Sequence, residues 1–470
     1  MYTVSACEPI YVWIPQDSLY KLDQLRYNKF MKNTPFKNRR QKILDQIDNG
    51  VALVPSASMQ IRSNDTEFPF RQESNFYYLS GFNEPECLLL MLKNAKEEKT
   101  VLFLRERNPE MEMWVGKRLG VKDAAKVLDV DEAYDISDLE ELLPGFLQGY
   151  NYLYLDTFSD NQYINTVKKV SNQLLHKRDV DISPRNFIHL NTLVEKERLI
   201  KDNHEIDQIK KAMGITTQAH HAAMAMAKPG MKEYEIQAII EYIFKKEGSQ
   251  HNAYESIVAG GNNANTLHYV ENSSSLKNGD LMLIDAGCEW NYYASDITRT
   301  SPVNGKFSKP QQALYEGILD AQSKIISSIK PGISKQLLQE RSQVLLTQVM
   351  LDLGIVKGSM DELIEKKVYK KYYPHGIGHW MGLDVHDTCP YKDEDAQEVL
   401  FEKGMILTIE PAIYLPEDDL DIPKEYRGIG IRTEDDILVT SKGYENLSKG
   451  IAKTVDEIEK MCIRDYREFL

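Results

Sequence analysis

Short apolar runs alternate with charged segments along residues 50 to 155. The runs read VALVP, CLLLML, TVLFL and YLYLD, and charged stretches such as KDAAKVLDVDEAY lie between them. Runs of this length are typical of buried strands, and the charged stretches are typical of helices that cover them. We therefore predict a compact α/β domain in the first half of the chain.

The apolar residues take a helical spacing after about residue 190, where SPRNFIHLN interrupts the earlier pattern. We predict one long helix from Glu195 to about Met226 and a second through EYEIQAIIEYIFKKEG, whose isoleucines form the apolar stripe of a core-facing helix. A third helix is predicted after Ser308, because SKPQ supplies a cap residue, an early proline and a glutamine. Strands and turns lie between and after these helices, so the second half is predicted to be an α+β domain.

The composition is that of a globular protein without an affinity for polyanions. The chain has 470 residues, of which 42% are hydrophobic and 27% charged, and this balance suits a soluble protein of about two to four domains. The formal charge is −14 and no block of lysine and arginine occurs. We therefore predict no nucleic-acid partner and no membrane partner.

The cysteines and the N-terminus indicate a cytoplasmic protein. The cysteines are scattered and form no CxxC pair, so neither a disulfide framework nor a zinc knuckle is expected. No basic segment precedes the first apolar run, which Glu8 and Pro9 interrupt, and no apolar stretch reaches membrane-spanning length. We predict reduced thiols at Cys7, Cys87, Cys288, Cys389 and Cys462.

Two aspartates lie in the otherwise charge-poor stretch LMLIDAGCEWNYYASDITRT, residues 281–300. We predict a strand that ends at Asp285, a turn, and a returning strand. A hairpin centred between Trp290 and Asn291 would place Asp285 opposite Asp296. Buried carboxylates side by side repel, so they must share a proton, pair with cations or bind a metal.

The shared-proton alternative would resemble an aspartic-protease dyad. A small hydroxyl residue is expected after each aspartate of such a dyad, whereas Ala286 and Ile297 stand in those positions here. We therefore rank this alternative below the other two.

An apolar run closed by an acid occurs twice more, in GMILTIEPAIY with Glu410 and in GIGIRTEDDILVT with Glu434. One such acid would ordinarily face solvent at the end of a strand. Three repetitions favour a buried acidic cluster instead. The spacing leaves open whether Glu434, Asp435 or Asp436 points inward.

Three histidines fall within PHGIGHWMGLDVHD: His375, His379 and His386. The glycines between them make a regular helix improbable and the HExxH glutamate is absent, so a zincin site is a poor fit. A single histidine is as often structural as functional. A fourth, His268 in NTLHYVEN, is predicted to lie in a strand flanked by turns.

Together, four of the carboxylates that end these apolar runs and one histidine imidazole would form a hard, oxygen-rich ligand set. Such a set suits manganese, cobalt or iron better than a single structural zinc. Two divalent ions would balance the charge of the carboxylates, and a bridging water could then ionise near neutral pH. A buried strand can therefore end in an aspartate if cations bind there.

The motifs IDAG…SDITRT, HGIGHWMGLDVHD, TIEP and GIRTEDD, in this order, resemble the five-ligand signature of the pita-bread metallopeptidases. The details resemble the bacterial type of Xaa-Pro aminopeptidase, or aminopeptidase P, over nearly the whole chain. In the first half, DTEFPFRQESNFYYLSGFNEPE resembles the N-terminal domain of that family, which methionine aminopeptidases lack. The resemblance implies an N-terminal extension (1–25), an α/β domain (26–190), a pita-bread catalytic domain (191–456) and a C-terminal tail (457–470).

The resemblance also implies a metal-binding role for five side chains. Asp285 would hold one metal, Asp296 and Glu434 would bridge two metals, and His379 and Glu410 would complete the second. Glu410 would in addition carry a proton between the nucleophilic water and the leaving nitrogen.

Four further residues match substrate-side positions of the family: His268, His375, His386 and Arg432. His386 would hydrogen-bond the substrate and its tetrahedral intermediate. Arg432 could equally orient the neighbouring carboxylates as a cation behind the ligands.

The implied activity is that of a dinuclear-metal aminopeptidase. Such an enzyme releases the N-terminal residue from peptides with proline in second position, by attack of a metal-bridging hydroxide. The implied cofactors are two divalent ions, Mn²⁺ before Co, Fe or Zn. The implied partners are Xaa-Pro peptides and further copies of the chain, as a dimer or tetramer in which the N-terminal domain helps enclose a neighbour's active site.

Two alternatives remain open. Prolidase, an Xaa-Pro dipeptidase, shares the HGxGH and GIRxEDD motifs. The fold also occurs in proteins that work without catalytic metal, such as histone-chaperone domains and creatine amidinohydrolase, so a catalytically inactive binding module is the other alternative. All ligand positions are filled here, which favours the metalloenzyme.

Overall fold

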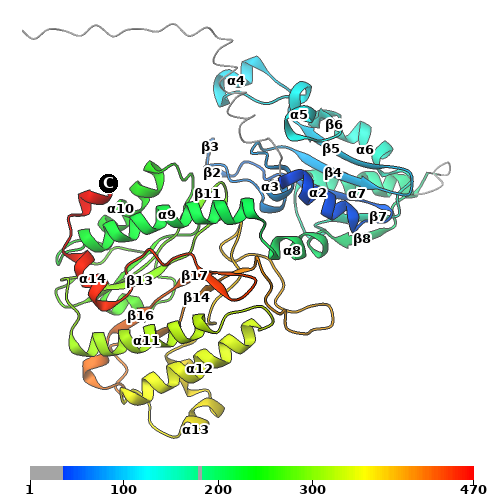
Figure 1. Ribbon diagram of the computed structural model, residues 1–470. Coiled ribbons are helices and arrows are strands. Elements are labelled where there is room, and N and C mark those ends of the chain that lie inside the picture. Colours follow the sequence, from blue (N-terminus) through cyan, green and yellow to red (C-terminus); the bar gives the residue numbers. More distant parts are fainter. Residues whose placement is uncertain (1–34, 178–182) are drawn as a thin grey trace, which may run out of the picture. The chain divides into compact units, whose positions relative to one another are not determined.

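The computed structural model describes residues 35–177 and 183–470 (Figure 1). The predicted N-terminal extension (1–25) and Cys7 lie outside the described residues. The chain forms two compact units, and the second begins at Glu195, close to the boundary predicted near residue 190.

The first unit is built on one mixed sheet. Its strands are β1 (Gly50–Pro55), β4 (Leu88–Lys93), β5 (Glu98–Leu104), β6 (Glu132–Asp135), β7 (Tyr152–Leu155) and β8 (Asn186–His189). Their order is β6-β5-β4-β1-β7-β8, and β1, β4 and β5 pair antiparallel while the outer pairings are parallel. The four apolar runs thus form β1, β4, β5 and β7 as predicted, and part of the interrupting SPRNFIHLN adds the edge strand β8.

Helices cover this sheet and account for the charged segments between its strands. They are α2 (Pro35–Asp45), α3 (Ser74–Ser80), α4 (Pro109–Val115), α5 (Val121–Leu128), α6 (Leu139–Leu147) and α7 (Gln162–Leu175), and a small hairpin joins β2 (Ile61–Ser63) to β3 (Thr66–Glu67). Leu143 of α6 and Val167 of α7 pack with Val51 and Leu90 of the sheet in one core. Helix α4 differs from the others, because it has no buried residue and its Met113 and Trp114 are 84% and 79% exposed.

The second unit contains short antiparallel sheets between two pairs of helices (Figure 1). Its helices are α9 (Asn203–Met226), α10 (Glu233–Lys246), α11 (Lys309–Ser327), α12 (Lys335–Asp352), α13 (Met360–Glu365) and α14 (Val455–Cys462). Its strands are β9 (Ile257–Gly260), β10 (Leu281–Asp285), β11 (Glu289–Trp290), β12 (Tyr293–Ala294), β13 (Thr298–Pro302), β14 (Ile406–Ile409), β15 (Ala412–Leu415), β16 (Ile429–Arg432), β17 (Asp435–Val439) and β18 (Tyr444–Asn446).

Each helix pair packs on its own group of strands. Helices α9 and α10 share a core with β9 and β10, and α11 and α12 share another with β15 and β16. Strand β10 lies between β13 and β9, and β17 lies between β14 and β18. The strands therefore form the middle of the unit, and their ends can meet in a buried site.

The predicted helices are confirmed in place, with one correction. Helix α10 and helix α11, which Ser308 caps together with Gln311, follow the prediction. The helix predicted from Glu195 is instead two, because α8 (Asn191–Leu199) ends and α9 starts anew. Asp202 accepts the Glu205 N–H at 2.9 Å and the Glu205 carboxylate accepts the Asp202 N–H at 3.0 Å, a reciprocal cap that begins a helix.

The hairpin that carries the two aspartates has a different register from the predicted one. Trp290 pairs with Tyr293, so the centre lies between Asn291 and Tyr292, and Asp285 stands opposite Thr298 instead of Asp296. Asn291 and Tyr292 both have positive φ, 48° and 69°. Two such residues form the tight turn whose twist matches that of paired strands.

The predicted C-terminal tail (457–470) is part of the second unit. Ile458 and Cys462 of α14 are buried in the same core as α11 and α12. The last turn, Tyr466–Phe469, contacts α9, where Gln218 Nε2 donates to the Phe469 carbonyl at 2.5 Å. In the described part of the chain, no helix combines the length and the apolar character needed to cross a lipid bilayer.

Candidate active site

The ends of several strands of the second unit meet around one pocket of about 560 Å³. Pairing of Ile409 with Asp435 and of Ala412 with Arg432 brings Glu410 beside Glu434, and the Glu434 N–H donates to the Thr298 carbonyl at 3.1 Å. Every site residue predicted from the sequence lines this pocket: His268, Asp285, Asp296, His375, His379, His386, Glu410, Arg432 and Glu434.

Three of these side chains are close enough to share one cation. Ligand atoms of Asp296, His379 and Glu434 all lie within 4.8 Å of one another. His379 Nε2 is 3.3 Å from Asp296 Oδ2 and 3.7 Å from Glu410 Oε1. Within the described residues, Asp285 Oδ1 is buried without a hydrogen-bond partner. A buried carboxylate oxygen left without a donor fits a site built for a cation.

The electrostatics of the acids point the same way. Burial raises the pKa of Asp285 and of Glu434, and repulsion from Asp296 adds to both shifts. Burial also raises the pKa of Glu410 to about 7, against the opposing effect of His379 and Arg432. Burial lowers the pKa of His379, but the hydrogen bond to Asp296 and its charge outweigh this and raise it to about 9. The donor set therefore suits divalent cations, which would replace these protons and relieve the repulsion.

Neighbouring hydroxyl groups hold the acids in position. Tyr254 donates its hydroxyl to Asp296 Oδ1 at 2.6 Å, and Thr298 donates to Glu434 Oε2 at 2.7 Å. Sequence reasoning missed both residues, because a lone tyrosine or threonine carries no motif. The register correction explains Thr298, which stands beside Asp285 where Asp296 was expected.

Arg432 lies behind the ligands. Its Nη2 is 2.5 Å from Asp285 Oδ2, its Nε donates to Thr298 Oγ1 at 2.9 Å, and its Nη1 donates to the Tyr414 hydroxyl at 2.7 Å. These contacts favour the orienting role that the sequence left open for Arg432. The Tyr414 hydroxyl also lies 3.0 Å from His375 Nε2, so Tyr414 links Arg432 to His375, and no sequence motif indicated this.

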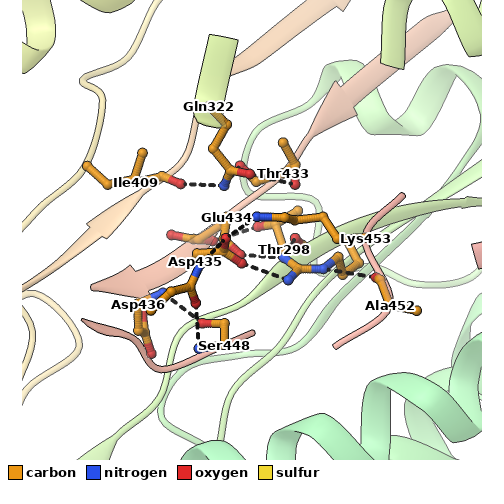
Figure 2. Close-up of polar contacts among 12 residues, drawn as sticks. Thr298, Gln322, Ile409, Thr433, Glu434, Asp435, Asp436, Ser448, Ala452 and Lys453 are labelled. Atoms are coloured by element: carbon orange, nitrogen blue, oxygen red, sulfur yellow. Dashed lines mark hydrogen bonds and ion pairs between the residues drawn. The ribbon is translucent and has the colours of Figure 1, made fainter. Parts of the chain in front are cut away.

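The three consecutive acids Glu434, Asp435 and Asp436 have different polar partners (Figure 2). Glu434 lines the pocket. Asp435 pairs with Arg299 at 2.7 Å and Lys453 at 2.6 Å, and these cations hold its pKa below the usual range despite burial. Asp436 accepts the Asp296 N–H at 3.1 Å. Alternation along the chain places Asp435 on the face opposite Glu434 and Asp436, and of these three acids Glu434 alone lines the pocket.

The histidine-rich segment is irregular, as its glycines predicted, and it lies along β14. His379 N–H donates to Thr408 Oγ1 at 3.0 Å, and Thr408 N–H donates back to the His379 carbonyl at 2.9 Å. A Cβ on Gly378 would be 1.9 Å from the Thr408 carbonyl oxygen. Glycine is therefore required at 378 for the chain to approach the strand this closely.

The other histidines surround the acids. The rings of His379 and His386 are 4.4 Å apart, and His375 Nδ1 is 3.6 Å from Glu410 Oε2. Burial lowers the pKa of His375 to about 4, so its ring is neutral at neutral pH. His268 lies in a turn after the short helix Gly261–Asn265 and not in the predicted strand.

A buried ion-pair group anchors the end of this segment. Asp387, next to His386, contacts Arg198 and lies 2.9 Å from Lys201 Nζ. Burial opposes ionisation of Asp387, yet these two cations hold its pKa at about 2. The group fixes the loop to the α8–α9 junction. No sequence motif indicated this group, because Asp387 is 189 positions from Arg198 and 186 from Lys201.

Comparison with known proteins identifies the family. Residues 207–441 match metallopeptidase family M24, and residues 36–154 match the aminopeptidase P N-terminal domain. The chain is 42% identical to the Xaa-Pro aminopeptidase of Haemophilus influenzae over 93% of this chain and 99% of that protein. The chain belongs to the aminopeptidase P family of M24 metallopeptidases. Another relative, the Xaa-Pro aminopeptidase of Escherichia coli, is 39% identical over 91% of this chain and 97% of the relative.

Solved structures of this metallopeptidase family confirm the fold. The chain matches Pseudomonas aeruginosa aminopeptidase PepP with a TM-score of 0.88 at 40% identity, over 91% of this chain and 97% of that one. Zn-substituted E. coli aminopeptidase P in complex with product gives a TM-score of 0.87 at 37% identity, with the same coverage. The predicted α/β N-terminal domain and α+β pita-bread catalytic domain are therefore correct.

Proposed function

We propose that this M24 aminopeptidase uses two divalent metal ions to release the N-terminal residue from peptides with proline in second position. The observation that carries the proposal is the convergence of Asp285, Asp296, His379, Glu410 and Glu434 in one buried pocket. Relatives that are named Xaa-Pro aminopeptidase cover nearly the whole chain, which supports the substrate class.

The metal ligands in this proposal are those implied by the sequence motifs. Asp285 would hold one ion, His379 and Glu410 would hold the second, and Asp296 and Glu434 would contribute to both. Bound there, the ions would supply the positive charge that activates a water and polarises the scissile carbonyl. Oxygen-rich ligands favour Mn²⁺, with Co, Fe or Zn as alternatives; one similar structure is named as Zn-substituted.

Glu410 and His386 act on the peptide itself in this mechanism. Glu410 takes a proton from the attacking water and gives it to the leaving nitrogen. His386 hydrogen-bonds the substrate carbonyl and the tetrahedral species that follows. His268 and His375 line the pocket, and in this proposal they face the substrate, while Arg432 holds Asp285 through its guanidinium.

Product analysis by mass spectrometry tests the proposal. Metal-stripped protein is incubated with Mn²⁺ and three peptides: an Xaa-Pro dipeptide, an Xaa-Pro-Xaa tripeptide and an Xaa-Ala-Xaa control. We expect release of the first residue from the tripeptide, none from the control, and no activity without metal. Cleavage of the dipeptide alone would identify a prolidase, and no cleavage together with no bound metal would identify a binding module.

We also propose a homo-oligomer, a dimer or tetramer, in the cytoplasm. The exposed Met113 and Trp114 of α4 offer an apolar surface for a second copy of the chain. Light scattering of the intact protein and of a Trp114→Ser, Met113→Ser variant tests this, because loss of the oligomer in the variant would support the contact and an unchanged mass would contradict it.

A further inference from the structure

Lys335 carries a positive charge into the active-site pocket that no acidic side chain of the described residues pairs with. It is the first residue of α12, a helix that is labelled in Figure 1. Its side chain lines the pocket and is partly buried. The pocket's arginine, Arg432, is bound to Asp285. Lys335 instead lies over the ring of Tyr391, with Nζ 4.1 Å from the ring centroid. Its charge therefore remains available to a bound molecule.

Tyr391, which packs against Lys335, is itself held by Trp380. The Tyr391 hydroxyl accepts the Trp380 N–H at 3.2 Å, and the two rings stack with centroids 5.7 Å apart. Lys335 Nζ also lies 3.9 Å from the position that a Cβ on Gly376 would take. Burial lowers the pKa of Lys335, and the charge of Glu410 acts against this shift. A partly desolvated cation without an ion pair is stabilised when a ligand brings an anion to it.

The position of Lys335 relative to the reacting groups indicates which part of a peptide it meets. Gly376 follows His375, whose Nδ1 is 3.6 Å from Glu410 Oε2. In the proposed function, Glu410 delivers the proton to the leaving nitrogen, so Lys335 lies on the leaving-group side. The free carboxylate of a tripeptide lies two residues beyond that nitrogen, at a distance of about 7 Å in an extended chain.

We propose that Lys335 binds a carboxylate of the peptide on the leaving-group side of the scissile bond and thereby selects substrates that are negatively charged there. This inference rests on the proposed function and adds a specificity determinant to it. The carboxylate can be the free C-terminus of a tripeptide or an acidic side chain on the third residue. The two sources share one chemistry, and matched peptides separate them.

The test uses the intact Mn²⁺-loaded enzyme and two pairs of peptides. The first pair is Xaa-Pro-Ala with a free C-terminus and the same peptide as its amide. The second is Xaa-Pro-Asp-amide and Xaa-Pro-Asn-amide, which are nearly isosteric. The variant is Lys335→Met, with Lys335→Arg as the charge-conserving variant and Lys330→Met, an exposed lysine outside the pocket, as the control.

We expect the wild-type enzyme to prefer the anionic member of at least one pair by about fivefold in kcat/KM, as for a partly exposed ion pair. The preference should arise in KM, weaken at high salt, disappear in Lys335→Met and persist in Lys335→Arg and Lys330→Met. A preference in the first pair alone identifies the C-terminus, and one in the second pair alone identifies the third side chain.

Three outcomes would overturn the inference. The first is equal rates for both members of both pairs in the wild-type enzyme. The second is an equal loss for all peptides in Lys335→Met, which would make Lys335 a structural residue. The third is wild-type enzyme that cleaves none of the peptides, which would refute the proposed function itself and this inference with it.

Discussion

Glu434 and Asp435 are neighbouring buried acids, yet replacing each with its amide should change the stability of the metal-free protein in opposite directions. Glu434 stands among like charges, with ligand atoms of Asp296 and Glu434 within 4.8 Å. Two unit charges at that separation repel by about 3.5 kcal/mol at an effective dielectric constant of about 20. Protonation of Glu434 in the metal-free state relieves part of this repulsion. We therefore expect Glu434→Gln to raise the free energy of unfolding by about 1–3 kcal/mol.

The amide should fit the position of Glu434. Its oxygen can still accept the Thr298 hydroxyl, which donates to Glu434 Oε2 at 2.7 Å, and its NH₂ group can donate to a remaining carboxylate. The gain in stability therefore reflects lost repulsion and not a rearranged pocket.

Asp435→Asn is the matched control, because Asp435 is paired. Arg299 binds its Oδ1 and Lys453 binds its Oδ2, and the substitution leaves both cations without their partner. Breaking a buried ion pair in this way costs about 3–5 kcal/mol. We expect this loss both with and without metal.

Calorimetry of the two variants in EDTA and in Mn²⁺ near neutral pH measures these effects. A change of 1 kcal/mol shifts the midpoint of a domain of this size by about 2–4 °C. In EDTA, the unfolding midpoint of Glu434→Gln should be higher than that of the wild type, and the midpoint of Asp435→Asn should be lower. Mn²⁺ should stabilise the wild type and Asp435→Asn but add little to Glu434→Gln. The reasoning is refuted if Glu434→Gln is destabilised in EDTA, or if Mn²⁺ stabilises it as much as the wild type.

Three further substitutions test other parts of the site and fold. Glu410→Gln should lower kcat by about 10²–10⁴-fold while peptide still binds in calorimetric titration; full activity would exclude its proton-carrying role. Gly378→Ala should lower the unfolding midpoint and the metal content measured by mass spectrometry, because the new Cβ would meet the Thr408 carbonyl at 1.9 Å; an unchanged midpoint would show that the segment can move away. Burial lowers the pKa of His221 to about 4, and its ring accepts the Ala452 N–H, so the unfolded state binds its proton first and stability falls as pH drops from about 6.5 to 4. His221→Gln should flatten that part of a midpoint-against-pH curve; an unchanged slope would assign the acid sensitivity to other groups.

The sequence predicted a helix or strand well when the pattern that indicates it lies within that element or at its end. The apolar runs became β1, β4, β5 and β7, and the cap at Ser308 became the start of α11. The break before α9 was missed although Asp202 and Glu205 carry a capping signal, because the apolar spacing continued through it. The predicted hairpin was centred one residue too early. The turn uses Asn291 and Tyr292 at positive φ, and tyrosine is an unusual residue there.

The sequence predicted the residues that line the candidate site, but it did not predict the residues that hold them in position. The acids can be recognised in the sequence because each follows an apolar run, and the histidines because they lie among glycines. Tyr254 and the Arg198–Asp387 contact arise from chain segments far apart in sequence. Their roles depend on tertiary packing, which no spacing rule contains.

The alternation of Glu434, Asp435 and Asp436 also determines which genetic changes this strand can accept. Substitutions at one position alter one side of the strand and leave the other intact, as the opposite partners of Glu434 and Asp435 show. An inserted or deleted residue before Glu434 would exchange the two faces. After a deletion, Asp435 would take the place of Glu434 in the pocket; after an insertion, Glu434 would take the place of Asp435 and meet Arg299. Length variation among related chains should therefore be confined to loops such as 392–398, outside this stretch.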